Sequence, residues 1–283
     1  MKSGRPPKLP YDDHVKKLGE WTASTSASMD QMMEATLRVR DAERAKEPNI
    51  SLYSLQVEAI GHRIARRFDA ALSACSKAIH AASDHPLTHL IQAQVRYDLR
   101  NYEQAAVDAM AAINLEPQLA QAQTVLGTIR QAQGKTTDAL AAYTKAVELD
   151  ASNLRPKVGL AESYLRLRAW SQAITTCREI LAEKPDSRNA QDLLVAALLE
   201  SGQPMEAAAE ARQILSSNPN SPSVSYALSR AQAKLGNFTA AISQLQHFLS
   251  LKTSSLDAPY LLGVYRLALD DISGARESFQ SAQ

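Results

Sequence analysis

The sequence predicts an all-α protein, an α-solenoid of stacked helical hairpins, on three observations. Alanine recurs seven times at an interval of 34 residues, at Ala71, Ala105, Ala139, Ala173, Ala207, Ala241 and Ala275. A second column of mostly small residues runs at the same interval, 12 positions earlier. Glycine and proline recur at fixed points between the apolar segments. A period of this length, built on small residues, indicates one helical hairpin per repeat.

The second column fixes where the helices of a hairpin approach each other. If Ala71 is position 20, the repeats start at Leu52, Pro86, Ala120, Leu154, Arg188, Pro222 and Leu256. Position 8 then holds Ala59, Ala93, Gly127, Ala161, Val195, Ser229 and Gly263. Packed helices lie about 8–10 Å apart, and only small side chains at the crossing permit the shorter distances. We therefore expect the alanine column, with Gly127 and Gly263, to mark close helix crossings.

The third repeat shows the internal plan of the hairpin. Residues 122–133 and 137–149 are rich in helix formers, and Gly134 lies between them. Gly202 and Gly236 recur at the same turn position, where a residue with positive φ can end the first helix. Pro117, Pro185 and Pro219 close their repeats at position 32, because proline disfavours helical geometry in the residue before it. One hairpin cannot bury its own apolar stripe, so we expect neighbouring repeats to stack.

The N-terminal residues lie outside this pattern. Residues 1–28 are basic at first and then rich in Ser and Thr, which predicts a flexible leader, with a docking arm as the functional alternative. Residues 29–51 place Met32, Ala35, Val39 and Ala42 at helical spacing. We expect a capping helix, or the second helix of a decayed repeat, which covers the end of the stack.

At the C-terminal end of the array, the sequence predicts no capping helix. The last predicted helix, residues 273–282, has no polar helix after it, and this leaves Phe279 with few neighbours. We expect that the chain is a fragment of a longer protein or that this end docks onto another surface.

Composition excludes several classes of function. Basic and acidic residues number 31 and 30, so the net charge of +1 gives no field that concentrates nucleic acid or an anionic membrane. No apolar run approaches the ~20 residues that span a bilayer, and residues 1–10 do not begin a signal peptide. We expect a soluble, cytoplasmic protein. Cys75 and Cys177 occupy equivalent positions in different repeats, too far apart for a disulfide, which predicts buried free thiols.

The sequence offers little catalytic chemistry. The best metal-like cluster is His80, Asp84, His85 and His89, but Pro86 puts His85 at a helix edge and no paired zinc-ligand spacing supports it. There is no glycine-rich phosphate loop, no Gly-x-Ser-x-Gly elbow and no thiol paired with a histidine. We therefore expect no enzymatic activity, no metal and no cofactor.

These columns resemble the tetratricopeptide repeat. Besides the small residues at positions 8 and 20 and proline at 32, an aromatic residue stands at position 17 in Phe68, Tyr102, Trp170 and Phe238, and alanine at position 27 in Ala78, Ala112 and Ala146. The tryptophan that the family usually has at position 4 is absent. The resemblance covers residues 52–283. It implies a right-handed superhelix whose concave groove, lined by the first helix of each hairpin, holds a peptide or protein segment.

The resemblance also implies which residues line that groove, because positions 2, 5, 9, 12 and 13 of the first helix face inward in this family. The candidates are Arg155, Glu162, Arg166, Asn189, Asp192, Tyr226, Arg230, Lys234 and Tyr260, with Glu200 and Ser223 beside them. Mixed charge with tyrosine anchors favours an extended peptide that carries an acidic side chain, bound by arginine or lysine. The alternative is that these charges only solvate an exposed helix face.

Two other functions compete with a general scaffold. Tetratricopeptide arrays in related architectures precede sulfotransferase, glycosyltransferase or hydroxylase domains, so the chain can be read as the targeting domain of a longer enzyme. A chaperone adaptor of this family would grip a C-terminal carboxylate with Lys at position 5 and Asn at position 9. Position 5 here holds Gln56, Leu90, Thr124, Val158, Asp192, Tyr226 and Tyr260, which excludes that clamp.

Overall fold

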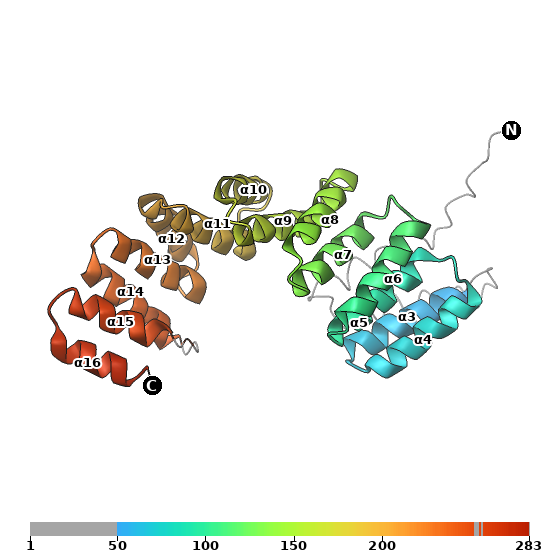
Figure 1. Cartoon of the computed structure of the whole chain (residues 1–283), viewed down its shortest axis with the longest axis horizontal. Helices are drawn as coiled ribbons and strands as arrows, with labels where there is room; N and C mark the ends of the chain where they lie inside the picture. The colour runs from blue at the N-terminus through green and yellow to red at the C-terminus, as the bar shows by residue number, and fades with distance from the viewer. Residues whose placement is uncertain (1–49, 252–254, 256, 283) are drawn as a thin grey trace. The chain divides into compact units, whose positions relative to one another are not determined.

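The computed structural model describes residues 50–251, 255 and 257–282 (Figure 1). The predicted leader (1–28) and most of the predicted capping segment (29–51) lie outside these residues. In order, the helices are α3 Ile50–Ile64, α4 Phe68–Ala81, α5 Pro86–Asp98, α6 Tyr102–Leu115, α7 Ala120–Ala132, α8 Thr136–Leu149, α9 Leu154–Arg166, α10 Trp170–Glu183, α11 Arg188–Glu200, α12 Pro204–Ser217, α13 Pro222–Lys234, α14 Phe238–Ser250, α15 Asp257–Leu267 and α16 Ile272–Gln280. The described residues contain no strand, as expected for an all-α fold.

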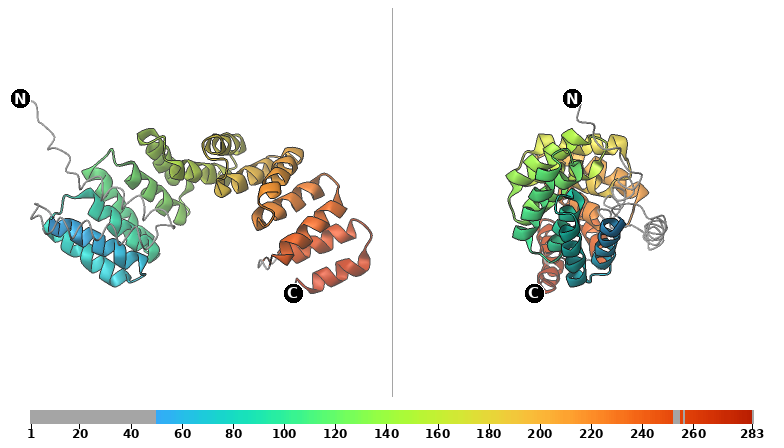
Figure 2. Two further views of the ribbon diagram at one scale, coloured as in Figure 1. Left: turned by 180° about the vertical axis from the view of Figure 1, so that it is seen from behind. Right: turned by 90° about the vertical axis from the view of Figure 1, so that its right-hand side faces the viewer.

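The chain divides into two compact units, which we call the N-terminal unit (Met1–Pro156) and the C-terminal unit (Lys157–Gln283). In the N-terminal unit α3 packs on α4, α5 on α6 and α7 on α8, and the first helices α3, α5 and α7 also contact one another in succession. In the C-terminal unit α13 packs on α14 and α15 on α16, and α11 contacts α13 (Figures 1 and 2). Stacked hairpins, as predicted, therefore build each unit, with first helices beside first helices.

The register of the repeat is visible in where the helices begin. The second helix of every described hairpin starts at position 17, from Phe68 in α4 to Ile272 in α16. The seven alanines of position 20 therefore lie one turn inside these helices, and each is at most 1% exposed. The last helix ends at Gln280, two residues before the predicted end, with Ser281 as its C-cap.

Position 8 packs against position 24, a pairing that the repeat columns did not indicate. A Cβ atom built on Gly127 would lie 2.7 Å from the Tyr143 ring, and one on Gly263 would lie 2.5 Å from the Phe279 ring. Glycine therefore occurs where the partner at position 24 is aromatic. In the first and fourth repeats, alanine at position 8 accompanies a cysteine at position 24 in the same core cluster.

Those cysteines, Cys75 and Cys177, are free and buried, as predicted. Burial raises the pKa of each thiol from 9.0 to about 12, because the interior disfavours the thiolate. Both thiols therefore act as small packing groups at the helix crossing.

The turn inside each hairpin requires a left-handed residue in all seven repeats. Position 15 has a φ of 74–81° at Gly134, Gly202 and Gly236, and of 57–60° at Arg66, Arg100, Arg168 and Asp270. The sequence indicated this turn only at the three glycines. The other four residues adopt a conformation that costs an L-residue roughly 1–2 kcal/mol, so the packing of the hairpin imposes it.

Candidate protein-interaction surface

The predicted groove residues are divided between the two units. Arg155 belongs to the N-terminal unit, whereas Glu162, Arg166, Asn189, Asp192, Tyr226, Arg230, Lys234 and Tyr260 belong to the C-terminal unit. The C-terminal unit therefore contains most of the candidates.

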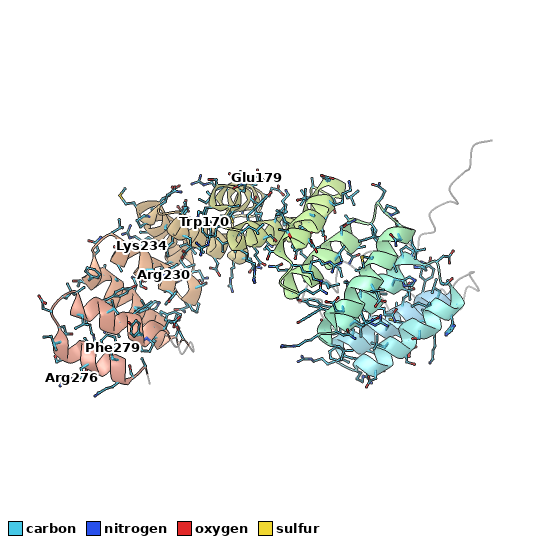
Figure 3. The ribbon with its side chains drawn as sticks, in the orientation of Figure 1. Trp170, Glu179, Arg230, Lys234, Arg276 and Phe279 are labelled. Atoms are coloured by element: carbon cyan, nitrogen blue, oxygen red, sulfur yellow. The ribbon has the colours of Figure 1, made fainter. Side chains whose placement is uncertain are left out.

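Two of the predicted peptide-binding cations already have partners within the protein. The Arg230 guanidinium lies 2.9 Å from a carboxylate oxygen of Glu200 and donates a hydrogen bond to it. Lys234 Nζ donates to the main-chain carbonyl of Leu199, at 3.0 Å. Both contacts join α13 to the C-terminal end of α11, where the helix dipole favours positive charge. Figure 3 shows Arg230 and Lys234 along α13. These charges therefore fix the spacing of two first helices.

Asp192 makes a second link between the same helices. The pKa of its carboxyl is raised by burial, while a hydrogen bond with Ser223 and the nearby charge of Arg188 lower it. Ser223 lies at the start of α13, so α11 and α13 are joined near both ends. A rigid surface of this kind loses little conformational entropy when a partner binds.

Tyr226 and Tyr260 differ in how much of each side chain is buried. Tyr226 packs against Phe248 of α14, with ring centroids 5.3 Å apart, and burial raises the pKa of its hydroxyl. Tyr260 packs against Phe279 of α16 at 5.4 Å, yet 57% of it remains exposed. Tyr260 is therefore held by one ring contact and presents the rest of its surface to solvent.

Arg166 and Asn189 are exposed at the end of α9 and the start of α11. Arg166 has no ion-pair partner among the described residues, and Glu162, one turn earlier, is half-buried. A pocket of about 360 Å³ opens close by, lined by Leu165, Arg168, Trp170 and Glu200. Glu200 thus both pairs with Arg230 and borders a pocket that can receive a side chain.

Arg155 lies among groups of the N-terminal unit. Its side chain is exposed, although neighbouring protein groups displace enough water to lower the pKa of its guanidinium. Tyr143 and Tyr97 oppose this shift, and Arg63 adds to it. Arg155 therefore lies within electrostatic range of residues of α3, α5 and α8.

One largely buried ion pair of the described residues was not found from the sequence. Arg96 on α5 donates to both carboxylate oxygens of Asp108 on α6, at 2.7 and 2.8 Å, and Asp108 is only 7% exposed. Burial raises the pKa of the Asp108 carboxyl from 3.8 to about 6, although Arg96 and His89 lower it. The available signal was an aspartate at position 23, within the small-residue face of α6.

Two histidines of the metal-like cluster, His85 and His89, have other contacts. His85 Nδ1 lies 3.0 Å from the side-chain amide of Gln56, and His89 Nε2 lies 3.0 Å from the carbonyl of Ser83. Within the described ranges, no three His, Cys, Asp or Glu side chains gather as metal ligands would. In the same ranges, no helix combines the length and the apolar character that crossing a membrane requires.

Comparison with known proteins identifies the repeat. Models of the tetratricopeptide repeat match residues 130–197 and 193–255. The small glutamine-rich tetratricopeptide repeat-containing protein 2 of Mycosarcoma maydis is 31% identical over 120 residues, which cover 42% of this chain and 34% of that protein. The protein of the same name from Saccharomyces cerevisiae is 29% identical over 86 residues, or 30% of this chain and 25% of that protein. The match thus spans about a third or less of these relatives.

Solved structures share the fold at low sequence identity. PilW, a type IV pilus biogenesis factor, superposes with a TM-score of 0.63 at 18% identity, covering 70% of this chain and 92% of PilW. YrrB, a tetratricopeptide repeat protein with an unusual peptide-binding site, gives 0.56 at 16% identity, covering 65% of this chain and 95% of YrrB. The Cut9–Hcn1 assembly gives 0.62 at 13% identity, covering 97% of this chain and 57% of the matched one.

The repeat period, the hairpins and these matches agree with one another. The fold supports a general role as a protein-interaction scaffold. The chain is a tetratricopeptide repeat protein.

Proposed function

We propose that this protein is a non-enzymatic scaffold whose C-terminal unit holds an extended peptide or protein segment along its first helices. The observation that carries the proposal is the contrast on that surface between fixed and exposed side chains. The ion pair of Arg230 with Glu200 and the hydrogen bond from Lys234 to α11 connect α11 to α13. Tyr260, Arg166 and Asn189, in contrast, remain exposed. A preformed surface with exposed polar and aromatic groups suits a partner segment that becomes ordered on binding.

The exposed side chains of this surface indicate which side chains the bound peptide should carry. Since Arg230 and Lys234 have partners within the protein, Arg166 is the candidate cation that best fits an acidic side chain of the peptide. Tyr260 offers an aromatic face, and the pocket beside Trp170 can receive a second side chain. The peptide we expect therefore carries an acidic residue and at least one apolar or aromatic anchor.

Two structural relatives agree with this use of the fold. YrrB is described as having a peptide-binding site, and Cut9 was solved in an assembly with Hcn1. Their sequence identity to this chain is below 20%, so they support protein binding as a class and do not identify the partner. We also propose a reducing compartment such as the cytoplasm, with which the buried free thiols of Cys75 and Cys177 are compatible.

Site-specific photo-crosslinking in native cell extract tests the proposal. A photoreactive amino acid replaces Asn189 or Tyr260 on the first helices, and in a control it replaces Glu179, which is exposed on the second helix α10 (Figure 3). We expect the same crosslinked partner at Asn189 and Tyr260, and its loss when Arg166→Glu is added. Crosslinking to the same partner at Glu179 alone would place the interface on the second helices and contradict the proposal.

A further inference from the structure

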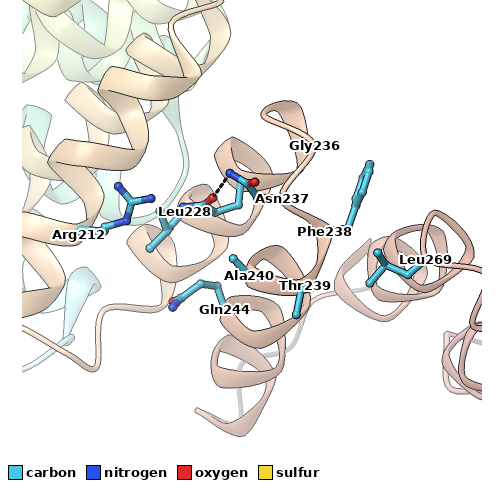
Figure 4. Close-up of a pocket in the computed structure, with 10 residues that line it drawn as sticks. Arg212, Leu228, Gly236, Asn237, Phe238, Thr239, Ala240, Gln244 and Leu269 are labelled. Carbon is cyan, nitrogen blue, oxygen red and sulfur yellow. Dashed lines mark hydrogen bonds between the residues drawn. The ribbon is translucent and has the colours of Figure 1, made fainter.

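The C-terminal unit contains a second pocket, built mainly by α12, α13 and α14. It has a volume of about 540 Å³, and Arg212, Gln232, Asn237, Thr239, Ala240 and Gln244 supply much of its polar wall. Figure 4 shows Arg212 from α12 on one side and the first turn of α14 on the other. No residue that lines this pocket is acidic.

The equivalent place one repeat earlier contains a carboxylate, and this pocket does not. Arg178 and Arg212 occupy the same position, 25, in the fourth and fifth repeats. Arg178 forms an ion pair with Glu206, which stands at position 19 of the following repeat. The residue equivalent to Glu206 for Arg212 is Ala240. Arg212 has no ion-pair partner among the described residues, so its guanidinium borders the pocket without a carboxylate.

The N-terminus of α14 opens into the same pocket. Asn237 stands at the N-cap but accepts no hydrogen bond from the first turn, whereas Asn101, its equivalent in the second repeat, accepts one from the N–H of Gln104 at 3.4 Å. Within the described part of the chain, the main-chain N–H groups of Thr239 and Ala240 have no acceptor. Unpaired N–H groups and the helix dipole make such a terminus favourable for an anion.

The side-chain amide of Gln232 supplies a further donor at this pocket. Gln232 lines the pocket and is 4% exposed. Its Oε1 accepts a hydrogen bond from Asn237 Nδ2 at 3.1 Å, which explains why Asn237 does not cap α14 (Figure 4). The remaining donor, Gln232 Nε2, has no acceptor among the described residues. This nitrogen is not fully buried, so water in the pocket can accept from it, and a bound anion would take the place of that water.

We propose that this pocket binds an oxyanion, a carboxylate or phosphate group, in the place that the Glu206 carboxylate takes beside Arg178 one repeat earlier. Arg212 supplies the charge, and Gln232 Nε2 with the N–H groups of Thr239 and Ala240 supplies neutral donors. The donors come from three helices, so the oxygen atoms of one small anion can be bound from several directions. This site is separate from the surface proposed for the peptide.

Titration with inorganic phosphate and, separately, with acetate tests the site. The backbone amide resonances of Thr239 and Ala240 are followed by ¹⁵N NMR against sodium chloride at equal ionic strength. We expect saturable shifts at both amides with at least one probe, and the tighter probe identifies the anion. Saturation by neither probe would overturn the proposal.

Three variants make the test specific. Arg212→Gln should weaken binding of the probe at least tenfold, and Ala240→Glu should abolish it while raising the melting temperature, because the new carboxylate pairs with Arg212. Arg178→Gln is the matched control, which should leave the titration unchanged. Unchanged binding in Arg212→Gln or in folded Ala240→Glu would overturn the assignment.

Discussion

Residues 50–156 and residues 157–282 use the same helical hairpin but bury different polar side chains. In the N-terminal unit, buried amides and carboxylates join neighbouring helices: Gln56 donates to Thr88 at 2.7 Å, and Arg96 pairs with Asp108. In the C-terminal unit, the buried polar residues are mainly serines that bond to their own helix, as Ser163 does to Gly159 and Ser229 to Tyr226. Contacts between hairpins there depend more on leucine.

This difference follows from single columns of the repeat. Position 7 is Glu58 and Gln92 in the first two repeats and leucine in the five that follow. Gln92 is buried nevertheless, so polar groups enter the N-terminal core and need partners there. The stability of the N-terminal unit should therefore depend on hydrogen bonding and pH, and that of the C-terminal unit on apolar packing.

The largest expected change in stability comes from substitutions where positions 8 and 24 pack together. Gly127→Ala should lower the free energy of unfolding by about 2–3 kcal/mol, because its Cβ would overlap the Tyr143 ring. Tyr143 cannot move easily, since it is 3% exposed and its hydroxyl donates to Gln131 at 2.9 Å. Gly263→Ala should cost less, because Phe279 is only half-buried in the last described hairpin. Urea denaturation measures both variants.

The double variant Gly127→Ala/Tyr143→Cys supplies the control for that prediction. It recreates the alanine–cysteine pair of the first and fourth repeats, Ala59 with Cys75 and Ala161 with Cys177. We expect it to recover part of the lost stability. If Gly127→Ala alone melts like the parent, the two positions are not in contact.

The next effect concerns the pH dependence of the N-terminal unit. The pKa of Asp108 is higher in the folded chain than its ordinary value, so folding takes up a proton and this group stabilises the fold as pH falls. The contribution is lost as pH rises through about 6 and is complete below 3.8. Between pH 7.5 and 4.5 it should amount to roughly 2 kcal/mol.

Asp108→Asn should remove that pH dependence, which denaturation at several pH values would show as a difference from the parent. Asp192→Asn is the matched change in the C-terminal unit. Its effect should be smaller, because Asp192 is only half-buried. Equal pH profiles for the parent and Asp108→Asn would mean that the ion pair with Arg96 keeps Asp108 ionised throughout.

The smallest expected change in stability concerns the positive-φ residue at position 15. It should be the same in both units, because this turn lies within a single hairpin. Arg100→Gly and Arg168→Gly should each stabilise the chain by up to about 1 kcal/mol, since glycine adopts positive φ without strain. Gly134→Ala should have the opposite sign, with no steric clash to add to it. Chemical denaturation of the three variants checks this, and a stabilised Gly134→Ala would contradict it.

The repeat frame predicted the parts of the fold that depend on one hairpin. The period of Ala71 to Ala275 gave the helices and their register, because a small residue is needed wherever two helices cross. It did not show that Arg66, Arg100 and Arg168 adopt positive φ, because arginine, unlike glycine, is not typical of a left-handed turn. There the packing of two helices overrides the preference of one residue.

Contacts between repeats were harder to predict than contacts within one. The pairs Glu200–Arg230 and Arg178–Glu206 join position 13 to position 9 and position 25 to position 19 of the next repeat. Which positions meet depends on the offset between stacked hairpins, and a single sequence does not give that offset. For this reason, the sequence did not show that Arg230 and Lys234, which it predicted as groove cations, have partners within the protein.

The central claim, that the first helices of the C-terminal unit bind an acidic peptide segment, is tested most directly by charge reversal. Peptides selected from a display library against the purified protein are titrated against the parent, Arg166→Glu and Arg276→Glu. Arg276 is exposed on the second helix α16 and serves as the matched control. We expect selected peptides with an acidic residue, at least tenfold weaker binding to Arg166→Glu, and no change for Arg276→Glu. Equal affinity for the parent and Arg166→Glu would contradict the claim.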